Sequence, residues 1–223
     1  MMKLIVGMNS IDDYKAFVEA GADEIFCGYI PDWWYEIKGM HVPFNRREVH
    51  YSSVQIGSRS DLRILKKMVD HYHVPVTITL NALSYDPKDY PLLRRYINEC
   101  KEDGFNRFII ADLALLYELK DMKDIVIHIS GEAGEVNHLV LDFYAQFPYS
   151  RLIFPRHISL EEMSKCIQNK EYEAFIFNEK CHYFGGYCNS LHCDELKHMC
   201  LVKYQRDIEY PDLINEEAMG ATG

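Results

Sequence analysis

Short β-rich runs alternate with amphipathic helical runs along most of this 223-residue chain. The predicted strands cover residues 4–6, 24–29, 74–80, 108–110, 124–129, 151–154 and 174–177. The predicted helices cover residues 11–20, 61–72, 90–102, 113–119, 137–147 and 160–169. Strands that alternate with helices form a parallel sheet with right-handed crossovers. This alternation limits the chain to a small number of α/β architectures.

The number of strands favours a TIM-barrel-like (β/α)8 fold over an open doubly wound sheet. Residues 201–204 supply only a short eighth strand, so we expect the eighth unit to be incomplete or irregular. The length suits one domain, which we expect to span residues 1–208. An acidic tail, residues 209–223, is expected to be flexible. The long stretch 31–58 is predicted to be a functional loop.

The formal net charge of −10 argues against a broad nucleic-acid surface and against binding to anionic membranes. The first residues read as a strand and not as a signal peptide, and no apolar run approaches the ~18 residues of a membrane span. We therefore expect a cytoplasmic protein with reduced thiols. Seven cysteines, an odd number, also fit poorly with a fully paired disulfide framework.

In a barrel, chemistry takes place where the strands end. His128 and Ser130 lie two residues apart on one predicted strand, so their side chains point to the same side. We predict that they are catalytic together with Arg156, although a purely structural role for each is the alternative. The residues that follow or close the predicted strands are Tyr29, Asn81, Asp112, His128, Ser130 and Arg156.

Four cysteines gather in the last quarter of the chain with the spacing C-x6-C-x4-C-x6-C. They are Cys181, Cys188, Cys193 and Cys200. Soft thiolates favour zinc, copper(I) or an iron–sulfur cluster. Structural zinc sites usually contain a C-x(2–4)-C pair, and here the shortest gap only just reaches that range, between Cys188 and Cys193. Spacing therefore favours an iron–sulfur cluster but leaves zinc and unligated thiols open.

Other features of the sequence carry less information. Three nearby histidines can replace a thiolate as zinc ligands: His182, His192 and His198. Cys27, Cys100 and Cys166 are expected to be buried, non-functional thiols. The segment Gly131-Glu132-Ala133-Gly134 lacks a dinucleotide fingerprint, and the chain lacks the H-E-x-x-H and G-x-S-x-G motifs.

The cysteine segment resembles the signature of peptidase family U32, the collagenase-like peptidases. That signature contains Glu-x-Phe, then Cys, then Gly-x-Cys, which Glu173, Phe175, Cys181, Gly186 and Cys188 match. Upstream segments agree in order and spacing over roughly residues 3–200. They are GADEIFCG (21–28), Arg46 and Arg47 in an F-x-x-R segment, the T-L-N that ends at Asn81, the D-L of Asp112, IHISGEAGEVN (127–137) and PRHISLEEM (155–163).

The resemblance implies more than the family name says. Members include oxygen-independent hydroxylation factors that carry a 4Fe-4S cluster on four cysteines, which correspond to the four named above. For the barrel mouth we predict a polar substrate pocket to which Tyr29, Arg46, Arg47, Asn81 and Glu132 contribute contacts. Arginine suits a carboxylate substrate because it pairs in a bidentate way.

Three functions remain open from the sequence. The first is a 4Fe-4S enzyme for oxygen-independent hydroxylation or a related redox modification. The second is a peptidase or hydrolase, as the family name suggests, and the third is a metal-stabilised binding subunit that works with a protein partner.

Overall fold

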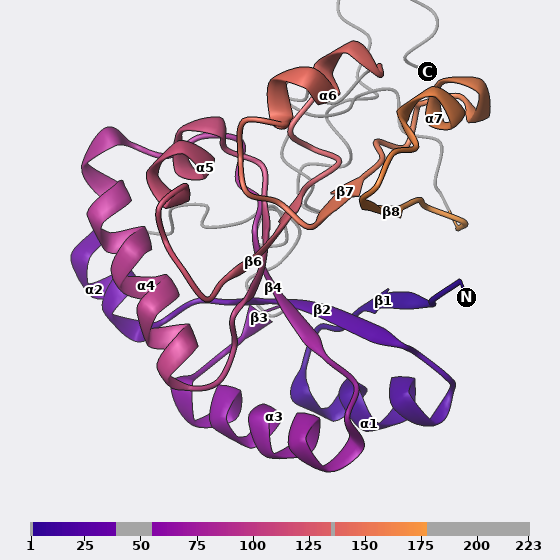
Figure 1. The fold of residues 1–223 in the computed structure, drawn as a ribbon. Coiled ribbons are helices and arrows are strands. Elements are labelled where there is room, and N and C mark those ends of the chain that lie inside the picture. The colour runs from indigo at the N-terminus through magenta and orange to yellow at the C-terminus, as the bar shows by residue number, and fades with distance from the viewer. Residues whose placement is uncertain (1, 39–54, 135–136, 178–223) are drawn as a thin grey trace, which may run out of the picture.

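The computed structural model describes residues 2–38, 55–134 and 137–177. All strand pairings among them are parallel, and the order in the sheet is β1-β2-β4-β5-β6-β7-β8, with β3 paired to β2. The strands are β1 (Ile5–Gly7), β2 (Glu24–Tyr29), β3 (Gln55–Ile56), β4 (Val76–Leu80), β5 (Arg107–Ile110), β6 (Val126–Ile129), β7 (Arg151–Ile153) and β8 (Glu171–Glu173). Within the described residues the sheet curls into a half-barrel, which confirms the TIM-barrel-like α/β prediction (Figure 1).

Helices connect successive strands and cover the outer face of the curled sheet (Figure 1). They are α1 (Ile11–Glu19), α2 (Asp32–Lys38), α3 (Arg59–Tyr72), α4 (Tyr90–Glu102), α5 (Leu113–Leu119), α6 (Leu139–Tyr144) and α7 (Leu160–Cys166), with a 3-10 turn η3 (Pro87–Asp89). Serine side chains cap two of these helices: Ser58 accepts a hydrogen bond from the Asp61 amide and Ser159 accepts one from the Glu162 amide. Such caps satisfy amides that have no partner inside the helix.

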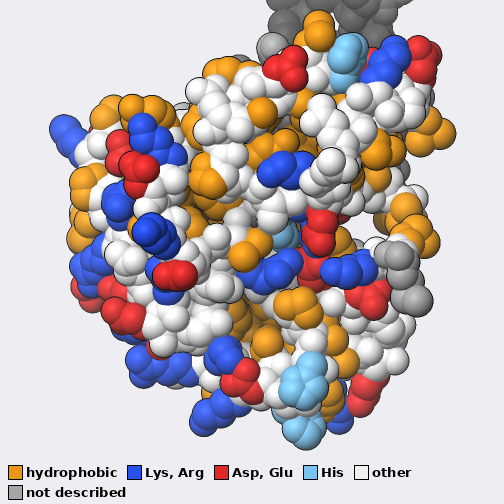
Figure 2. Space-filling model, viewed as in Figure 1, with side chains coloured by type: hydrophobic (Ala, Val, Ile, Leu, Met, Phe, Trp, Pro, Cys, Tyr) orange, Lys and Arg blue, Asp and Glu red, His pale blue; other side chains and the backbone are white. Residues whose placement is uncertain are grey.

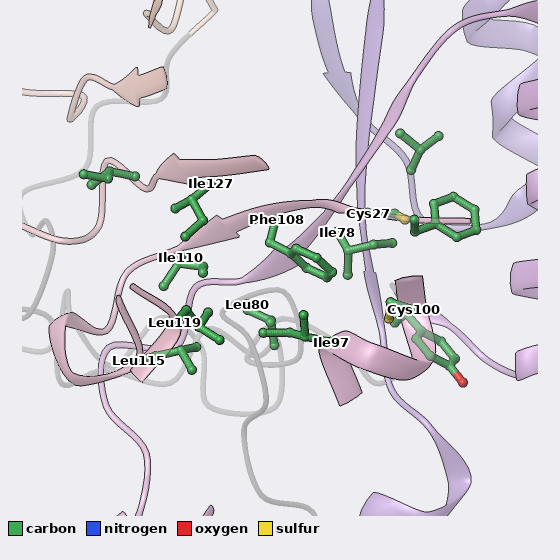
Figure 3. Close-up of a cluster of buried hydrophobic side chains, with 14 of the residues drawn as sticks. Cys27, Ile78, Leu80, Ile97, Cys100, Phe108, Ile110, Leu115, Leu119 and Ile127 are labelled. Atoms are coloured by element: carbon green, nitrogen blue, oxygen red, sulfur yellow. The ribbon is translucent and has the colours of Figure 1, made fainter. Parts of the chain in front are cut away.

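The apolar core lies between the sheet and the helices (Figure 3). Alternate residues of the strands, such as Cys27, Ile78 and Phe108, pack against residues of α4 and α5, such as Ile97 and Leu115. Because side chains alternate across a strand, the intervening residues line the concave face of the half-barrel. The cysteines that were expected to be buried are so: Cys27, Cys100 and Cys166.

The last described strand differs from its prediction. The sequence predicts a strand at 174–177, but β8 spans Glu171–Glu173, and Phe177 is exposed. Ion pairs from Arg151 to Glu171 and Glu173, together with stacking of Tyr172 on Phe154, hold this shorter segment against β7. The polar residues 171–173 therefore form the strand, and the apolar run that follows them does not.

The predicted loop 31–58 also contains regular structure, because α2 and β3 lie within it. Residues 201–204, the four clustered cysteines, Arg46, Arg47 and the 208/209 boundary lie outside the described residues. No helix in the described part of the chain is long and apolar enough to cross a bilayer.

Candidate functional site on the concave face

Charged and polar side chains gather on the concave face of the half-barrel. In Figure 2, basic and acidic side chains meet near the centre of the face, with a histidine among them. Those contributed by the strands include Glu24 of β2, Arg107 of β5, His128 of β6, and Arg151 of β7. Glu24, His128 and Arg151 are buried, so their charges and hydrogen bonds act in a medium of low dielectric constant.

Arg151 joins three strands. Its Nη1 and Nη2 atoms donate to the two carboxylate oxygens of Glu24 at 3.0 and 2.7 Å. Nη2 also donates to Glu171 at 2.8 Å, and Nη1 donates to Glu173 at 3.3 Å. A bidentate arginine–carboxylate pair is strong and directional. Arg151 therefore ties β7 to β2 across the half-barrel and to its neighbour β8.

The carboxylates around Arg151 differ in pKa. Burial raises the pKa of Glu24, but the hydrogen bonds from Arg151 and the charges of Arg151 and Arg107 outweigh it, so the pKa is lowered. Hydrogen bonding to Arg151 lowers the pKa of Glu171. Burial raises the pKa of Glu173 despite its contact with Arg151. Arg151 thus favours the ionised forms of Glu24 and Glu171, whereas burial works against the ionised form of Glu173.

His128 is held neutral in the middle of this network. The residue is 1% exposed, and its Nε2 atom lies 3.5 Å from Nη2 of Arg107. Burial, followed by the positive charges of Arg151 and Arg107, lowers the pKa of His128 to about 4. A neutral imidazole binds ligands through hydrogen bonds and is only a weak base at pH 7.

Ser130 lies just beyond the C-terminal end of β6 and is buried. Its hydroxyl accepts a hydrogen bond from the Glu132 amide at 3.2 Å, and its own amide donates to Ile110 at 2.8 Å. A Cβ atom on Gly131 would lie 2.9 Å from the Phe154 carbonyl oxygen. The loop after β6 therefore packs closely against the end of β7, which fixes the position of Ser130.

The other residues predicted for the site are spread over different surroundings. Tyr29 is buried and stacks on Tyr96 of α4, on the helix side of the sheet. Arg156 is exposed, and its guanidinium lies 5.2 Å from the ring centre of Phe175. Asn81 and Glu132 are half-buried after β4 and β6. The structure thus brings His128 together with the charged network and places Tyr29 away from it.

Asp112 serves as the cap of α5. Its Oδ1 atom accepts from the Ala114 amide at 2.8 Å, and its Oδ2 atom accepts from the Tyr90 hydroxyl at 2.9 Å. Burial, followed by the hydrogen bond to Asp112, raises the pKa of Tyr90 to about 12. This aspartate therefore fixes the start of the helix that follows β5.

We expect Asp112→Ala to lower the free energy of unfolding by about 1–2 kcal/mol, because the cap is lost in a buried setting. Tyr90→Phe is the matched control, since it removes only the hydroxyl contact, and it should cost less. Urea denaturation of both variants measures the difference. Equal losses in the two variants would show that the cap contributes nothing beyond the tyrosine contact.

Among the residues that the structure describes, two buried polar atoms on the concave face have no hydrogen-bond partner: Oγ1 of Thr77 and Nε of Arg107. Thr77 and Arg107 directly precede the paired residues Ile78 and Phe108, so they are neighbours on adjacent strands. The described ranges contain no group of three or more residues that could hold a metal ion.

The sequence matches the model of a known protein family. The model for peptidase family U32 matches residues 9–204, which is most of the sequence. This chain belongs to peptidase family U32. The match includes the segment that carries the four clustered cysteines and the whole of the described half-barrel from α1 onward.

Relatives of this U32 chain carry different names. It is 26% identical to "tRNA hydroxylation protein P" of Helicobacter pylori over 74% of this chain and 44% of that protein. It is 23% identical to the Escherichia coli protein of the same name, over 75% of this chain and 34% of the relative. An "uncharacterized protease" of Methanocaldococcus jannaschii is 20% identical over 84% of this chain and 43% of its own length. The chain therefore spans less than half the length of these relatives.

A solved U32 peptidase shares the fold. It superposes with a TM-score of 0.56 at 12% identity and covers 78% of this chain and 68% of that structure. At this identity the likeness concerns the fold alone.

Sequence reasoning missed the charged network of this U32 chain. The first residue of a strand is charged in three cases: Glu24, Arg107 and Arg151. From the sequence alone, a charged residue at the start of a strand is expected to be exposed to water. The signal that could have revealed the network is the two-residue alternation of side chains along each strand. Arg107 lies two residues from Ile109, which is paired with His128, and His128 is itself paired with Arg151, so all of these side chains share one face.

Proposed function

We propose that this U32 chain is an iron–sulfur enzyme that catalyses oxygen-independent hydroxylation or a related redox modification. The observation that carries the proposal is the set of four cysteines within twenty residues, in a chain that matches two tRNA hydroxylation proteins over about three quarters of its length. The last described strand before this set, β8, is fixed to the concave face through Arg151.

The donor set fits a 4Fe-4S cluster. Four thiolates are the usual ligands of such a cluster, and Cys181, Cys188, Cys193 and Cys200 would hold it. When bound, a 4Fe-4S cluster supplies one-electron transfer. Zinc is the alternative metal for the same thiols. Reduced thiols and a redox cluster are consistent with a cytoplasmic enzyme.

The chain's own residues would bind and orient the substrate. His128 offers a neutral hydrogen-bonding group on the concave face, and the exposed Arg156 can pair with a carboxylate or phosphate. Asn81 follows β4 and Ser130 follows β6, the two strands that flank β5 in the sheet. The net charge of −10 favours a small acid, or a macromolecule presented by a partner protein, over unaided binding along a nucleic-acid backbone.

The metal content tests the proposal directly. The full chain, purified without oxygen, should contain about four irons and four acid-labile sulfides and show a visible absorption band. Cys181→Ser and Cys193→Ser should lose most of the iron. Cys166→Ala is the matched control, because Cys166 is buried in α7 outside the four-cysteine set, and it should keep the iron. One zinc per chain without iron would contradict the proposal.

A peptidase is the second candidate, favoured by the name of the archaeal relative and by the placement of His128 and Ser130 on one strand end. Two observations weigh against it. The low pKa of His128 makes it a poor base, and the Ser130 hydroxyl is already engaged with the Glu132 amide. Peptide cleavage that survives Cys181→Ser would favour the peptidase. Loss of folding in the same variant would favour a metal-stabilised binding subunit.

A further inference from the structure

Arg107 lies between a carboxylate and an imidazole that come from different strands. Its Nη2 atom is 3.0 Å from Oε1 of Glu24 on β2 and 3.5 Å from Nε2 of His128 on β6. Glu24 is in turn held by both terminal nitrogens of Arg151. The orientation of the Arg107 guanidinium is therefore set by a carboxylate that is itself fixed.

The chemistry of the two facing groups determines where the His128 proton lies. A guanidinium has N–H donors and no acceptor, and it stays protonated in proteins. The Nε2 atom that faces Nη2 must therefore present its lone pair. A neutral imidazole carries one proton, so that proton lies on Nδ1. In the described part of the chain, Nδ1 makes no hydrogen bond, which leaves its N–H available.

We propose that Arg107 is a positioning residue that fixes His128 as the Nδ1–H tautomer, and that His128 offers this N–H to an acceptor oxygen of the ligand. The ligand group is a carbonyl, hydroxyl or carboxylate oxygen, because each can accept this hydrogen bond. His128 then acts as a donor and not as a general base. The role of this hydrogen bond in catalysis rests on the proposed function, whereas the assignment of the His128 tautomer does not.

The charged groups around His128 act in both directions, and their balance favours the neutral form. Arg107 on β5 and Arg151 on β7 place positive charge on the two neighbouring strands. Glu24 on β2 and Glu171 on β8 oppose them but are engaged by Arg151. Glu173 on β8 also contacts Arg151, and burial raises its pKa. The arginines and burial together outweigh the carboxylates, so the imidazole stays neutral at pH 7.

The test is long-range proton–nitrogen NMR of the full chain with labelled histidines at pH 7.5. His128→Gln assigns the signal. The wild type should show an excess of the Nδ1–H form, and its ratio of Nδ1–H to Nε2–H should be about tenfold higher than that of Arg107→Met, the factor that corresponds to a hydrogen bond worth ~1.4 kcal/mol. Arg107→Met should reverse the excess toward Nε2–H, the form that free imidazole side chains prefer. Arg107→Lys, which still only donates, should keep the Nδ1–H form.

One further spectrum completes the test. Arg63→Met removes an exposed arginine that contacts Asp103 and does not contact His128, so it should leave the signal unchanged. Arg107→Met should fold, because Glu24 keeps both hydrogen bonds from Arg151. An Nε2–H signal in the wild type would overturn the proposal without any variant, and so would an unchanged tautomer in Arg107→Met. The iron content is measured separately, so failure of the proposed function would leave this result standing.

Discussion

Replacing Arg151 with methionine should lower the free energy of unfolding by about 3–5 kcal/mol. Arg151 is 3% exposed and contacts Glu24, Glu171 and Glu173, so its loss leaves buried carboxylate charge without its main partner. Arg107 can compensate only one oxygen of Glu24. Urea denaturation at pH 7.5, followed by far-UV circular dichroism, measures the loss.

Two further variants show whether the loss comes from an unpaired buried charge. The double variant Glu24→Leu/Arg151→Met removes both members of the bidentate pair, and it should be more stable than Arg151→Met alone. Arg63→Met removes an exposed ion pair with Asp103 at 2.9 Å and should cost less than about 1 kcal/mol. A similar loss for Arg151→Met and Arg63→Met would show that the concave-face network does not stabilise the fold.

The bounds of a helix were predictable where its amphipathic pattern and its start signal indicate the same residues. α4 and α5 have the predicted bounds, 90–102 and 113–119, because each combines an amphipathic run with a clear start signal: Pro91 near the start of α4 and Asp112 before α5. The prediction of a strand at 174–177 was wrong because it relied on the hydrophobicity of these residues alone. The pairs between Arg151 and the glutamates of β8 instead fix residues 171–173 as the strand, and such long-range pairing is invisible in a local pattern.

The concave face was only partly predictable for a related reason. Strands buried on both sides show no clean alternation, so the sequence does not reveal which residues face inward. The two-residue spacing of His128 and Ser130 predicts their shared side of the strand, whereas Tyr29 follows only from its position near a strand end and packs against α4 instead. The roles of Arg46, Arg47 and the four clustered cysteines stay predictions, because they lie outside the described residues.

His128 should make the protein less stable in acid. Its pKa is lowered from 6.5 to about 4 in the folded chain, so between these values the unfolded chain binds more protons than the folded one. Stability from this group is therefore full above pH 6.5 and is lost as the pH falls. The shift corresponds to a loss of about 3 kcal/mol at pH 4, since one pKa unit is worth ~1.4 kcal/mol.

The contribution of His128 can be separated from that of the carboxylates. Glu24, whose pKa is lowered, also loses stability in acid, whereas Glu173, whose pKa is raised, acts in the opposite direction. Both are present in wild type and in His128→Gln, so the difference in unfolding free energy between the two, measured by urea denaturation from pH 4 to pH 8, isolates the histidine. That difference should change by about 3 kcal/mol in favour of the variant as the pH falls.

A flat difference between wild type and His128→Gln would mean that the folded chain takes up the proton at pH 6. Nε2 would then carry a proton toward Nη2 of Arg107, and the geometry that assigns His128 as a neutral donor would be wrong. A difference that grows below pH 6.5 means that burial and the two arginines keep the imidazole neutral, as a hydrogen-bond donor on this face requires.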